Sequence, residues 1–144
     1  MKIRKATRND FKDVAKIYRE AFSEPPFNEN WTLGEASKKI KVFSRYCDIW
    51  VPVIDREIAG FFIVNPNHWK IGEVAFGEDL VIKKKFRENE IGTKLFKFVF
   101  KYYKDKGYKK FMGIINKKAK SFGFIKKLNL EIEKRDVLIE KRLK

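Results

Sequence analysis

The sequence contains very few of the residues that build disulfides and metal sites: one cysteine and one histidine among 144 residues. A single cysteine, Cys47, excludes an internal disulfide and a cysteine-based metal cluster, and the single His68 has no partners for a triad or metal site. No run approaches the ~18 apolar residues of a membrane span, and no charged-then-apolar leader opens the chain. We therefore expect a cytoplasmic protein without membrane segments or bound metal.

Acidic residues are also scarce, mainly in the second half of the chain. The net charge is +15, of which residues 1–82 carry +1 and residues 83–144 carry +14. A basic half suits a polyanionic partner, and charge alone does not choose between nucleic acid and a phosphorylated cofactor. With 44% hydrophobic residues the chain has enough apolar material for a core, so residues 1–144 are expected to form one domain.

Hydrophobic periodicity predicts alternating helices and strands. Apolar residues recur at helical spacing after a capping box of Thr7 with Asp10, and again after Thr32 with Glu35. Asp55–Glu57 separate two β-rich runs, as in a hairpin. The predicted helices are 11–22, 33–43, 91–105 and 121–128, and the predicted strands are 1–6, 49–54, 58–64, 72–82, 110–115 and one or two strands within 132–143.

Residues 80–95 carry the most informative motif of the chain. An apolar strand end is followed by the basic turn 83–87, and Gly92 then stands at the opening of an amphipathic helix. Unpaired N–H groups and the dipole of a helix N-terminus favour bound anions, so this strand–turn–helix is expected to cradle phosphates. The ordinary alternative is a lysine-rich connection without a ligand.

This motif resembles the acetyl-CoA signature of the GNAT superfamily of N-acetyltransferases, Arg/Gln-x-x-Gly-x-Gly/Ala, and the order of predicted elements is similar to that family along nearly the whole chain. The resemblance implies an α/β (α+β) single domain, with a mixed, mostly antiparallel central sheet splayed in the middle and helices on both faces. It implies acetyl-CoA as co-substrate and a primary amine as acceptor: a protein N-terminus, a lysine or a small amine. The implied acetyl-CoA residues are Leu80, Val81, Ile82, Arg87, Glu88, Asn89, Glu90, Ile91, Gly92, Thr93, Asn116, Ser121 and Lys127.

The expected catalytic residue is Glu78, as the base that makes the acceptor amine neutral. Family members often carry Glu-Asp-Leu at this place, and the period of two puts Glu78 on the face of Leu80 and Asp79 on the opposite face. Asp79 and the more distant Glu73 are weaker candidates. A solvated or structural charge is the competing interpretation of Glu78.

Two positions depart from the family pattern. Glu90 replaces the first glycine, where a carboxylate would repel pyrophosphate unless its side chain points away. Ile125 replaces the tyrosine that commonly protonates the CoA thiolate. The proton would then come from Ser121, water or another hydroxyl, or the reaction would need no acid. Asn129 stands where a glycine is usual and tolerates the same left-handed backbone.

Two rival functions follow from the same features. The first is a basic nucleic-acid-binding module, in which aromatic residues among the lysines stack on bases. The second is a catalytically silent protein that binds acyl-CoA. Residues 25–31 with Trp50 are expected either to line an acceptor pocket or to form a core staple under a loop. The sequence leaves the acceptor, the acyl chain length and the oligomeric state open.

Overall fold

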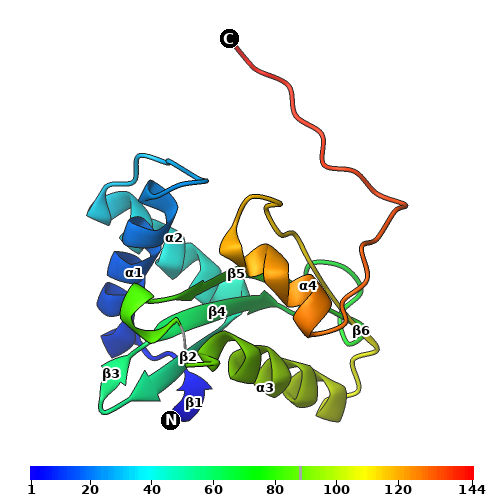
Figure 1. The fold of residues 1–144 in the computed structure, drawn as a ribbon, viewed down its shortest axis with the longest axis horizontal. Helices are drawn as coiled ribbons and strands as arrows, with labels where there is room; N and C mark the ends of the chain where they lie inside the picture. Colours follow the sequence, from blue (N-terminus) through cyan, green and yellow to red (C-terminus); the bar gives the residue numbers. More distant parts are fainter. Residues whose placement is uncertain (88) are drawn as a thin grey trace.

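A computed structural model describes residues 1–87 and 89–144; Glu88, one of the expected acetyl-CoA residues, lies outside the described residues. The chain folds around one six-stranded sheet with helices on both of its faces (Figure 1). The elements in chain order are β1 Lys2–Lys5, α1 Phe11–Ser23, α2 Leu33–Tyr46, β2 Asp48–Ile54, β3 Glu57–Ile58, β4 Gly60–Asn65, β5 Val74–Ile82, α3 Ile91–Asp105, β6 Lys110–Gly113 and α4 Phe124–Lys127.

The sheet has the strand order β1-β2-β4-β5-β6, with β3 paired to β2. All pairings are antiparallel except that of β5 with β6, which is parallel. The turn between β2 and β3 places Asp55 and Arg56 at positive φ, as the right-handed twist of a tight hairpin requires. This mixed, mostly antiparallel arrangement is the fold class that the sequence predicted.

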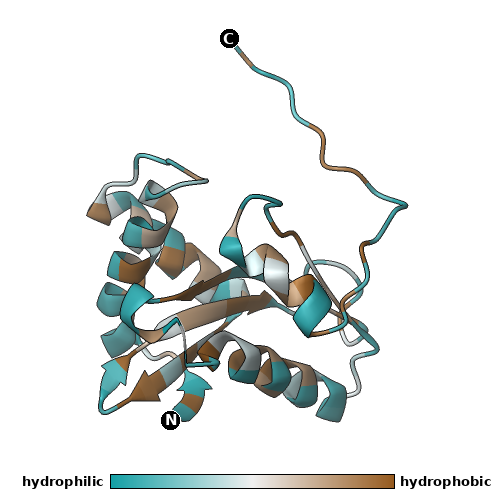
Figure 2. Ribbon diagram, viewed as in Figure 1, coloured by the Kyte–Doolittle hydropathy of each residue, from teal (hydrophilic) through white to brown (hydrophobic). Residues whose placement is uncertain are grey.

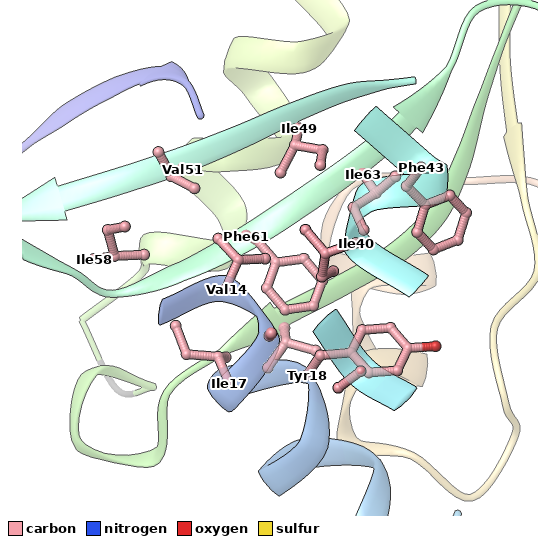
Figure 3. Close-up of a cluster of buried hydrophobic side chains, with 13 residues drawn as sticks. Val14, Ile17, Tyr18, Ile40, Phe43, Ile49, Val51, Ile58, Phe61 and Ile63 are labelled. Carbon is pink, nitrogen blue, oxygen red and sulfur yellow. The ribbon is translucent and has the colours of Figure 1, made fainter. Parts of the chain in front are cut away.

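Two apolar cores lie on opposite faces of the sheet. On one face, α1 and α2 pack their buried stripes against alternate side chains of β2, β4 and β5 (Figure 3). On the other face, α3 packs Leu95, Phe96 and Val99 against Trp50, Phe62 and neighbouring residues. Strand alternation sends successive residues to opposite faces, which explains why Phe61 belongs to the first core and Phe62 to the second. The hydropathy colouring shows the resulting apolar centre (Figure 2).

The helix ends follow local chemistry. The Thr32 hydroxyl accepts from the Glu35 N–H at 3.1 Å and the Glu35 carboxylate accepts from the Thr32 N–H at 2.9 Å, so the predicted capping box is confirmed. The capping box of Thr7 with Asp10 is also formed, and Arg4 reinforces it with an ion pair of 2.7 Å to Asp10. Gly107, with φ of 89°, follows the end of α3 as expected.

A buried polar contact joins the far end of α3 to β2. The indole Nε1 of Trp50 donates to the Tyr103 hydroxyl at 3.3 Å, and that hydroxyl donates to the Asp48 carboxylate. Burial is the main cause that raises the pKa of Tyr103, with the Asp48 hydrogen bond adding to it. The C-terminal end of α3 is therefore fastened to the sheet by hydrogen bonds as well as by packing.

The predicted closing strands within 132–143 are wrong. Residues 131–144 form no strand; the segment leaves the body beyond α4 and runs into open space (Figure 1). A strand exists only through hydrogen bonds to a neighbour, and no strand of the described chain lies against this segment. Smaller boundaries also differ. The run predicted at 58–64 divides into β3 and β4, β5 starts at Val74, β6 ends at Gly113, and the last helix divides into a 3₁₀ turn at Lys120–Gly123 and α4. No helix among the described residues is long and apolar enough to cross a membrane.

Candidate functional site

The sheet opens along one edge of β5. This strand pairs with β4 from Phe76 through Ile82, but with β6 only from Val74 to Gly77. From residue 78 onward, the side of β5 that faces away from β4 has no strand partner in the described chain. This is a splay in the middle of the sheet, at the place where the sequence located it.

The free edge exposes the backbone groups of two expected acetyl-CoA residues. The Lys83 N–H donates to the Ala59 carbonyl at 2.8 Å, so the alternation of an antiparallel pair turns Val81 toward β4 and the N–H and C=O of Leu80 and Ile82 away from it. The Ile82 carbonyl accepts from Nε of Arg87 at 2.9 Å. Arg87 therefore closes the end of the free edge, while the backbone of Leu80 remains open to a ligand.

A short connection leads from the free edge to the N-terminus of α3. A 3₁₀ turn at Lys84–Phe86 and a turn at Asn89 lead to Glu90, which has φ of 60°. This left-handed backbone explains why the family pattern has glycine here, and Glu90 keeps the conformation despite its side chain. The first N–H groups of α3, from Ile91 to Thr93, have no acceptor within the helix and are available to an anion.

The Glu90 carboxylate turns toward α4. Its Oε1 lies 2.5 Å from Nζ of Lys127, and this hydrogen bond is the main cause that lowers the pKa of Glu90. Lys94 and Lys97 lower that pKa further. The carboxylate therefore stands among cations, and the charge that would repel pyrophosphate is offset by a residue 37 positions later in the chain.

Gly92 provides the contact between α3 and α4. A Cβ at this position would lie 2.5 Å from Cζ of Phe124, which is shorter than the non-bonded contacts that Cβ atoms make in proteins. The Phe124 ring also packs on Phe96, with centroids 5.0 Å apart. Only glycine at position 92 allows α4 to sit this close to the first turn of α3.

Thr93, one of the expected acetyl-CoA residues, has a buried hydroxyl. Its side chain is buried, and Oγ1 has no hydrogen-bond partner among the described residues. A buried hydroxyl without a partner costs free energy, so a ligand oxygen that reached it would be favoured. The N–H groups of the first turn of α3, the unpaired hydroxyl and the free edge of β5 all fall within residues 80–93, where the sequence predicted the acetyl-CoA site.

The basic turn carries less free charge than its sequence suggests. Lys84 pairs with Glu24 at 2.7 Å, and Lys83 and Lys85 pair with Glu57 at 3.1 and 2.8 Å. These residues line a groove of about 340 Å³ between α1 and the turn. An anion that entered the groove would compete with these carboxylates for the lysines.

The two candidate carboxylates lie at an irregularity of the sheet. The register between β4 and β5 shifts between Ile63 and Val64, which leaves Glu78 without a partner across the strand pair. The Glu78 carboxylate accepts from Nδ2 of buried Asn65 at 3.1 Å. Asn65 therefore orients the side chain that the sequence named as catalytic base.

Asp79 has the more strongly perturbed environment. Burial raises its pKa to about 7, with Glu78 and Glu29 adding to the rise and Lys39 opposing it. Burial is likewise the main cause that raises the pKa of Cys47 to about 12, and both Glu78 and Asp79 contribute. The sequence prediction placed Glu78 and Asp79 on opposite faces because side chains alternate along a regular strand. A bulge interrupts that alternation, and Glu78 is close enough to raise the pKa of Asp79.

The remaining residues singled out in the sequence lie after β6, in or near α4. Asn116 is exposed and its Oδ1 accepts from the Lys118 N–H at 2.8 Å, within its own turn. Ser121 is half-buried in the 3₁₀ turn before α4, and Ile125 within α4 offers no hydroxyl. Asn129 has φ of 55°, in the left-handed conformation that the sequence suggested.

The aromatic residues of the 25–31 loop form a core staple. Phe27 packs on Phe22 with centroids 4.8 Å apart, and Trp31 packs edge-on against Tyr18 at 5.0 Å. Trp50 lies in the opposite core with α3, so it does not join that loop in one pocket. The combined acceptor pocket is a wrong prediction, because neighbouring strand residues face opposite sides of the sheet.

No metal site is present among the described residues. They contain no group of three or more His, Cys, Asp or Glu side chains arranged to hold an ion. His68 instead stacks on Phe76 with ring centroids 4.1 Å apart.

The fold and the open β5 edge are those of an acyltransferase, and sequence comparison names the family. Residues 11–129 match the acetyltransferase (GNAT) family. The chain therefore belongs to the GNAT family of acetyltransferases, which use acetyl-CoA as co-substrate. No curated protein matches the chain by sequence.

Solved structures share the fold at low identity. A possible acetyltransferase from Clostridium difficile 630 has a TM-score of 0.83 at 15% identity, covering 99% of this chain and 98% of that one. An aminoglycoside acetyltransferase from an uncultured soil metagenomic sample, in complex with sisomicin, has a TM-score of 0.68 at 17% identity, covering 99% and 96%. A transcriptional regulator from Bacillus halodurans C-125 has a TM-score of 0.76 at 15% identity, covering 97% and 99%.

Proposed function

We propose that the protein transfers the acetyl group of acetyl-CoA to a primary amine by direct attack in a ternary complex. The observation that carries the proposal is the free edge of β5, which begins beside a half-buried carboxylate pair and is followed in the chain, after a 3₁₀ turn, by the N-terminus of α3. A thioester held along this edge would lie beside Glu78 and Asp79. The acceptor is a protein N-terminus, a lysine or a small amine.

Different segments bind different parts of acetyl-CoA in this proposal. The backbone groups of Leu80 hold the pantetheine arm, and the first N–H groups of α3 hold the pyrophosphate. Lys127 keeps the Glu90 carboxylate from opposing the phosphates. Val81, whose backbone faces β4, contributes through its side chain in the core beneath the site.

The chemical step requires a neutral amine, because an ammonium has no lone pair. A carboxylate accepts the ammonium proton, directly or through water, and the nitrogen attacks the thioester carbonyl carbon. The new C–N bond forms as the C–S bond breaks, and the sulfur leaves with the electron pair and takes up a proton from Ser121 or water. The nitrogen loses its second proton to the same group or to solvent, which restores the proton given to sulfur and leaves a neutral amide. The free thiol has an ordinary pKa near 8.5, so its thiolate is a fair leaving group without a tyrosine at position 125.

Glu78 is proposed as the base because Asn65 orients its carboxylate. Asp79 is the competing candidate, because a carboxyl group with a pKa of about 7 is matched to proton transfer near neutral pH. Glu78 and Glu29 both add to the rise in the pKa of Asp79, so negative charge is concentrated near Asp79, and this charge favours a cationic amine there. The aminoglycoside acetyltransferase with a similar fold makes sisomicin a reasonable small-amine probe.

The proposal is tested by steady-state kinetics with acetyl-CoA against sisomicin, a lysine peptide and a peptide with a free N-terminus. Glu78→Gln is expected to lower kcat by about 10²–10⁴-fold while leaving acetyl-CoA affinity unchanged. Asp79→Asn is the matched control one residue away. If Asp79→Asn produces the large loss and Glu78→Gln does not, the base is Asp79; acetyl-CoA binding without product from any amine would instead indicate a silent acyl-CoA-binding protein.

A further inference from the structure

The hydroxyl of Tyr18 is a polar group set into the core between α1 and the sheet. Tyr18 is 4% exposed, and its ring lies 4.6 Å from that of Phe22 and 6.1 Å from that of Phe61, between centroids. Its oxygen points away from Ile17 (Figure 3), and no group of the described chain forms a hydrogen bond with it. Among the described residues only the Thr93 hydroxyl is both unpaired and fully enclosed, so a small polar group can still reach the Tyr18 oxygen. A hydroxyl that has lost water without gaining a partner favours a ligand that supplies one.

Glu29 is held beside the Tyr18 ring. Trp31 packs edge-on against this ring, with centroids 5.0 Å apart. The Trp31 indole Nε1 donates to Oε1 of Glu29 at 2.9 Å, and the Glu29 N–H donates to the Phe22 carbonyl at 2.8 Å. The side chain and the backbone of Glu29 are thus both bound to residues that contact Tyr18.

Asp79 approaches the same place from the sheet. Phe61 and Ile63 are alternate residues of β4 that face α1 and α2, and Ile63 pairs with Asp79 on β5. Directly opposite residues of an antiparallel pair share a face, so Asp79 lies on the face that α1 covers. The Tyr18 ring stacks on Phe61, which is two residues along β4 from the partner of Asp79.

The charges agree with these contacts. Burial is the main cause that raises the pKa of Tyr18, and the carboxylates of Asp79 and Glu29 raise it further. Glu78 and Glu29 in turn add to the rise in the pKa of Asp79 that burial causes, and Lys39 opposes them. A chain with a net charge of +15 therefore has a locally negative region around an unpaired hydroxyl.

This combination fits an organic cation that carries N–H groups. The phenol oxygen can accept a hydrogen bond and the carboxylates supply negative charge, and a protonated primary amine satisfies both. A metal ion fits less well, because the described residues contain no group of three or more His, Cys, Asp or Glu that could hold one. The departing sulfur of CoA also fits less well, because a proton given to it would leave a tyrosinate beside Asp79 and Glu29, which the same charges disfavour.

We infer that Tyr18, Asp79 and Glu29 bind the ammonium group of the acceptor, with the Tyr18 oxygen accepting a hydrogen bond from one of its N–H groups. The inference rests on the proposed function for the fate of this amine, and it adds a binding residue from α1, where the sequence predicted only the apolar face of a helix. The amine binds as a cation and becomes a nucleophile when Glu78, the next residue to Asp79, takes one of its protons.

The test is calorimetry of amine binding to the full chain, with and without CoA, which has no acetyl group to transfer. The probes are butylamine, a lysine peptide with a blocked N-terminus and a lysine-free peptide with a free N-terminus. Tyr18→Phe removes only the hydroxyl, and it is expected to weaken binding of the tightest probe by about 10-fold or more without changing CoA affinity. Glu29→Gln keeps an oxygen for the Trp31 indole and is expected to weaken the same probe.

Two controls separate the hydrogen bond from charge and packing. The trimethylated form of the same probe keeps the positive charge but has no N–H, so Tyr18→Phe is expected to leave its affinity unchanged. Tyr108→Phe removes a hydroxyl in the opposite core, where the ring packs on Tyr103 at 5.4 Å, and is expected to change neither affinity. The Tm of Tyr18→Phe is not expected to fall, because the hydroxyl has no partner to lose.

The inference is overturned if none of the three amines binds, if Tyr18→Phe leaves their affinity unchanged, or if it weakens the trimethylated probe equally. An amine that binds through Tyr18 but is never acetylated would refute the proposed reaction and support the ammonium site.

Discussion

The contact between Gly92 and Phe124 leads to a quantitative prediction for Gly92→Ala. The added Cβ would lie 2.5 Å from Cζ and 3.2 Å from Cε1 of Phe124. Carbon atoms prefer separations of about 3.5–4.0 Å, so the ring must retreat by roughly 1 Å. It cannot do so freely, because Phe96 packs against it at 5.0 Å. Overpacking of this kind typically costs about 1–3 kcal/mol.

Part of that cost is offset, because alanine favours a helix by up to about 1 kcal/mol over glycine. With the full offset we therefore expect Gly92→Ala to reduce the free energy of unfolding by up to about 2 kcal/mol, which corresponds to a fall in Tm of up to about 6 °C for a chain of 144 residues. The assay is thermal and denaturant unfolding followed by circular dichroism. Acetyl-CoA affinity should fall as well, because α4 is displaced from the N-terminus of α3.

A control at a second glycine and a double variant test whether the clash with the Phe124 ring causes the loss of stability. No atom lies within 4 Å of a Cβ built on Gly123, so Gly123→Ala is expected to be neutral or slightly stabilising. In a Phe124→Leu background the cost of Gly92→Ala should largely disappear, with a coupling of about 1 kcal/mol or more. The reasoning is refuted if both glycine variants shift Tm equally, or if the cost persists without the phenyl ring.

Other predictions concern the charged groups. The pKa of Asp79, about 7 against an ordinary 3.8, means that the folded state holds this proton to higher pH than the unfolded state. The associated stability is complete below about pH 4 and lost as pH rises through about 7, so Asp79→Asn should stabilise the protein more at pH 8 than at pH 5 in denaturant titrations; an equal gain at both values contradicts this. Glu90→Gln and Lys127→Gln are expected to change acetyl-CoA affinity in opposite directions by calorimetry, tighter and weaker respectively, with the double variant near the unchanged protein. Shifts in the same direction would show that the pair acts only on folding.

The sequence predicted those features that depend on local chemistry. The capping box of Thr32 with Glu35 and the helical stripe of residues 91–105 are decided by neighbours within a few positions, and the structure has both. The strand end and turn that precede Gly92 were predictable for the same reason. The roles of the individual site residues stay predictions.

Features that depend on distant neighbours were not predictable from the sequence. The pairing of Glu90 with Lys127 joins residues 37 positions apart, and the desolvation of Asp79 arises where a bulge breaks the alternation on which its orientation was judged. The segment 132–143 shows the limit most clearly. Its composition is that of a strand, but composition cannot supply the neighbouring strand that a sheet requires.

The hydrogen bonds of Tyr103 to Trp50 and Asp48 decide how α3 can move. They fasten one end of a 15-residue helix to the sheet, while the other end carries the N–H groups that are proposed to hold the pyrophosphate. A helix held at one end cannot slide along its axis, but it can tilt. With a rise of 1.5 Å per residue, the arm from Tyr103 to Gly92 is about 16 Å long, so a tilt of only a few degrees moves the turn by about 1 Å. Small adjustments at the first turn of α3 are thus pivoting motions about the C-terminal end of the same helix.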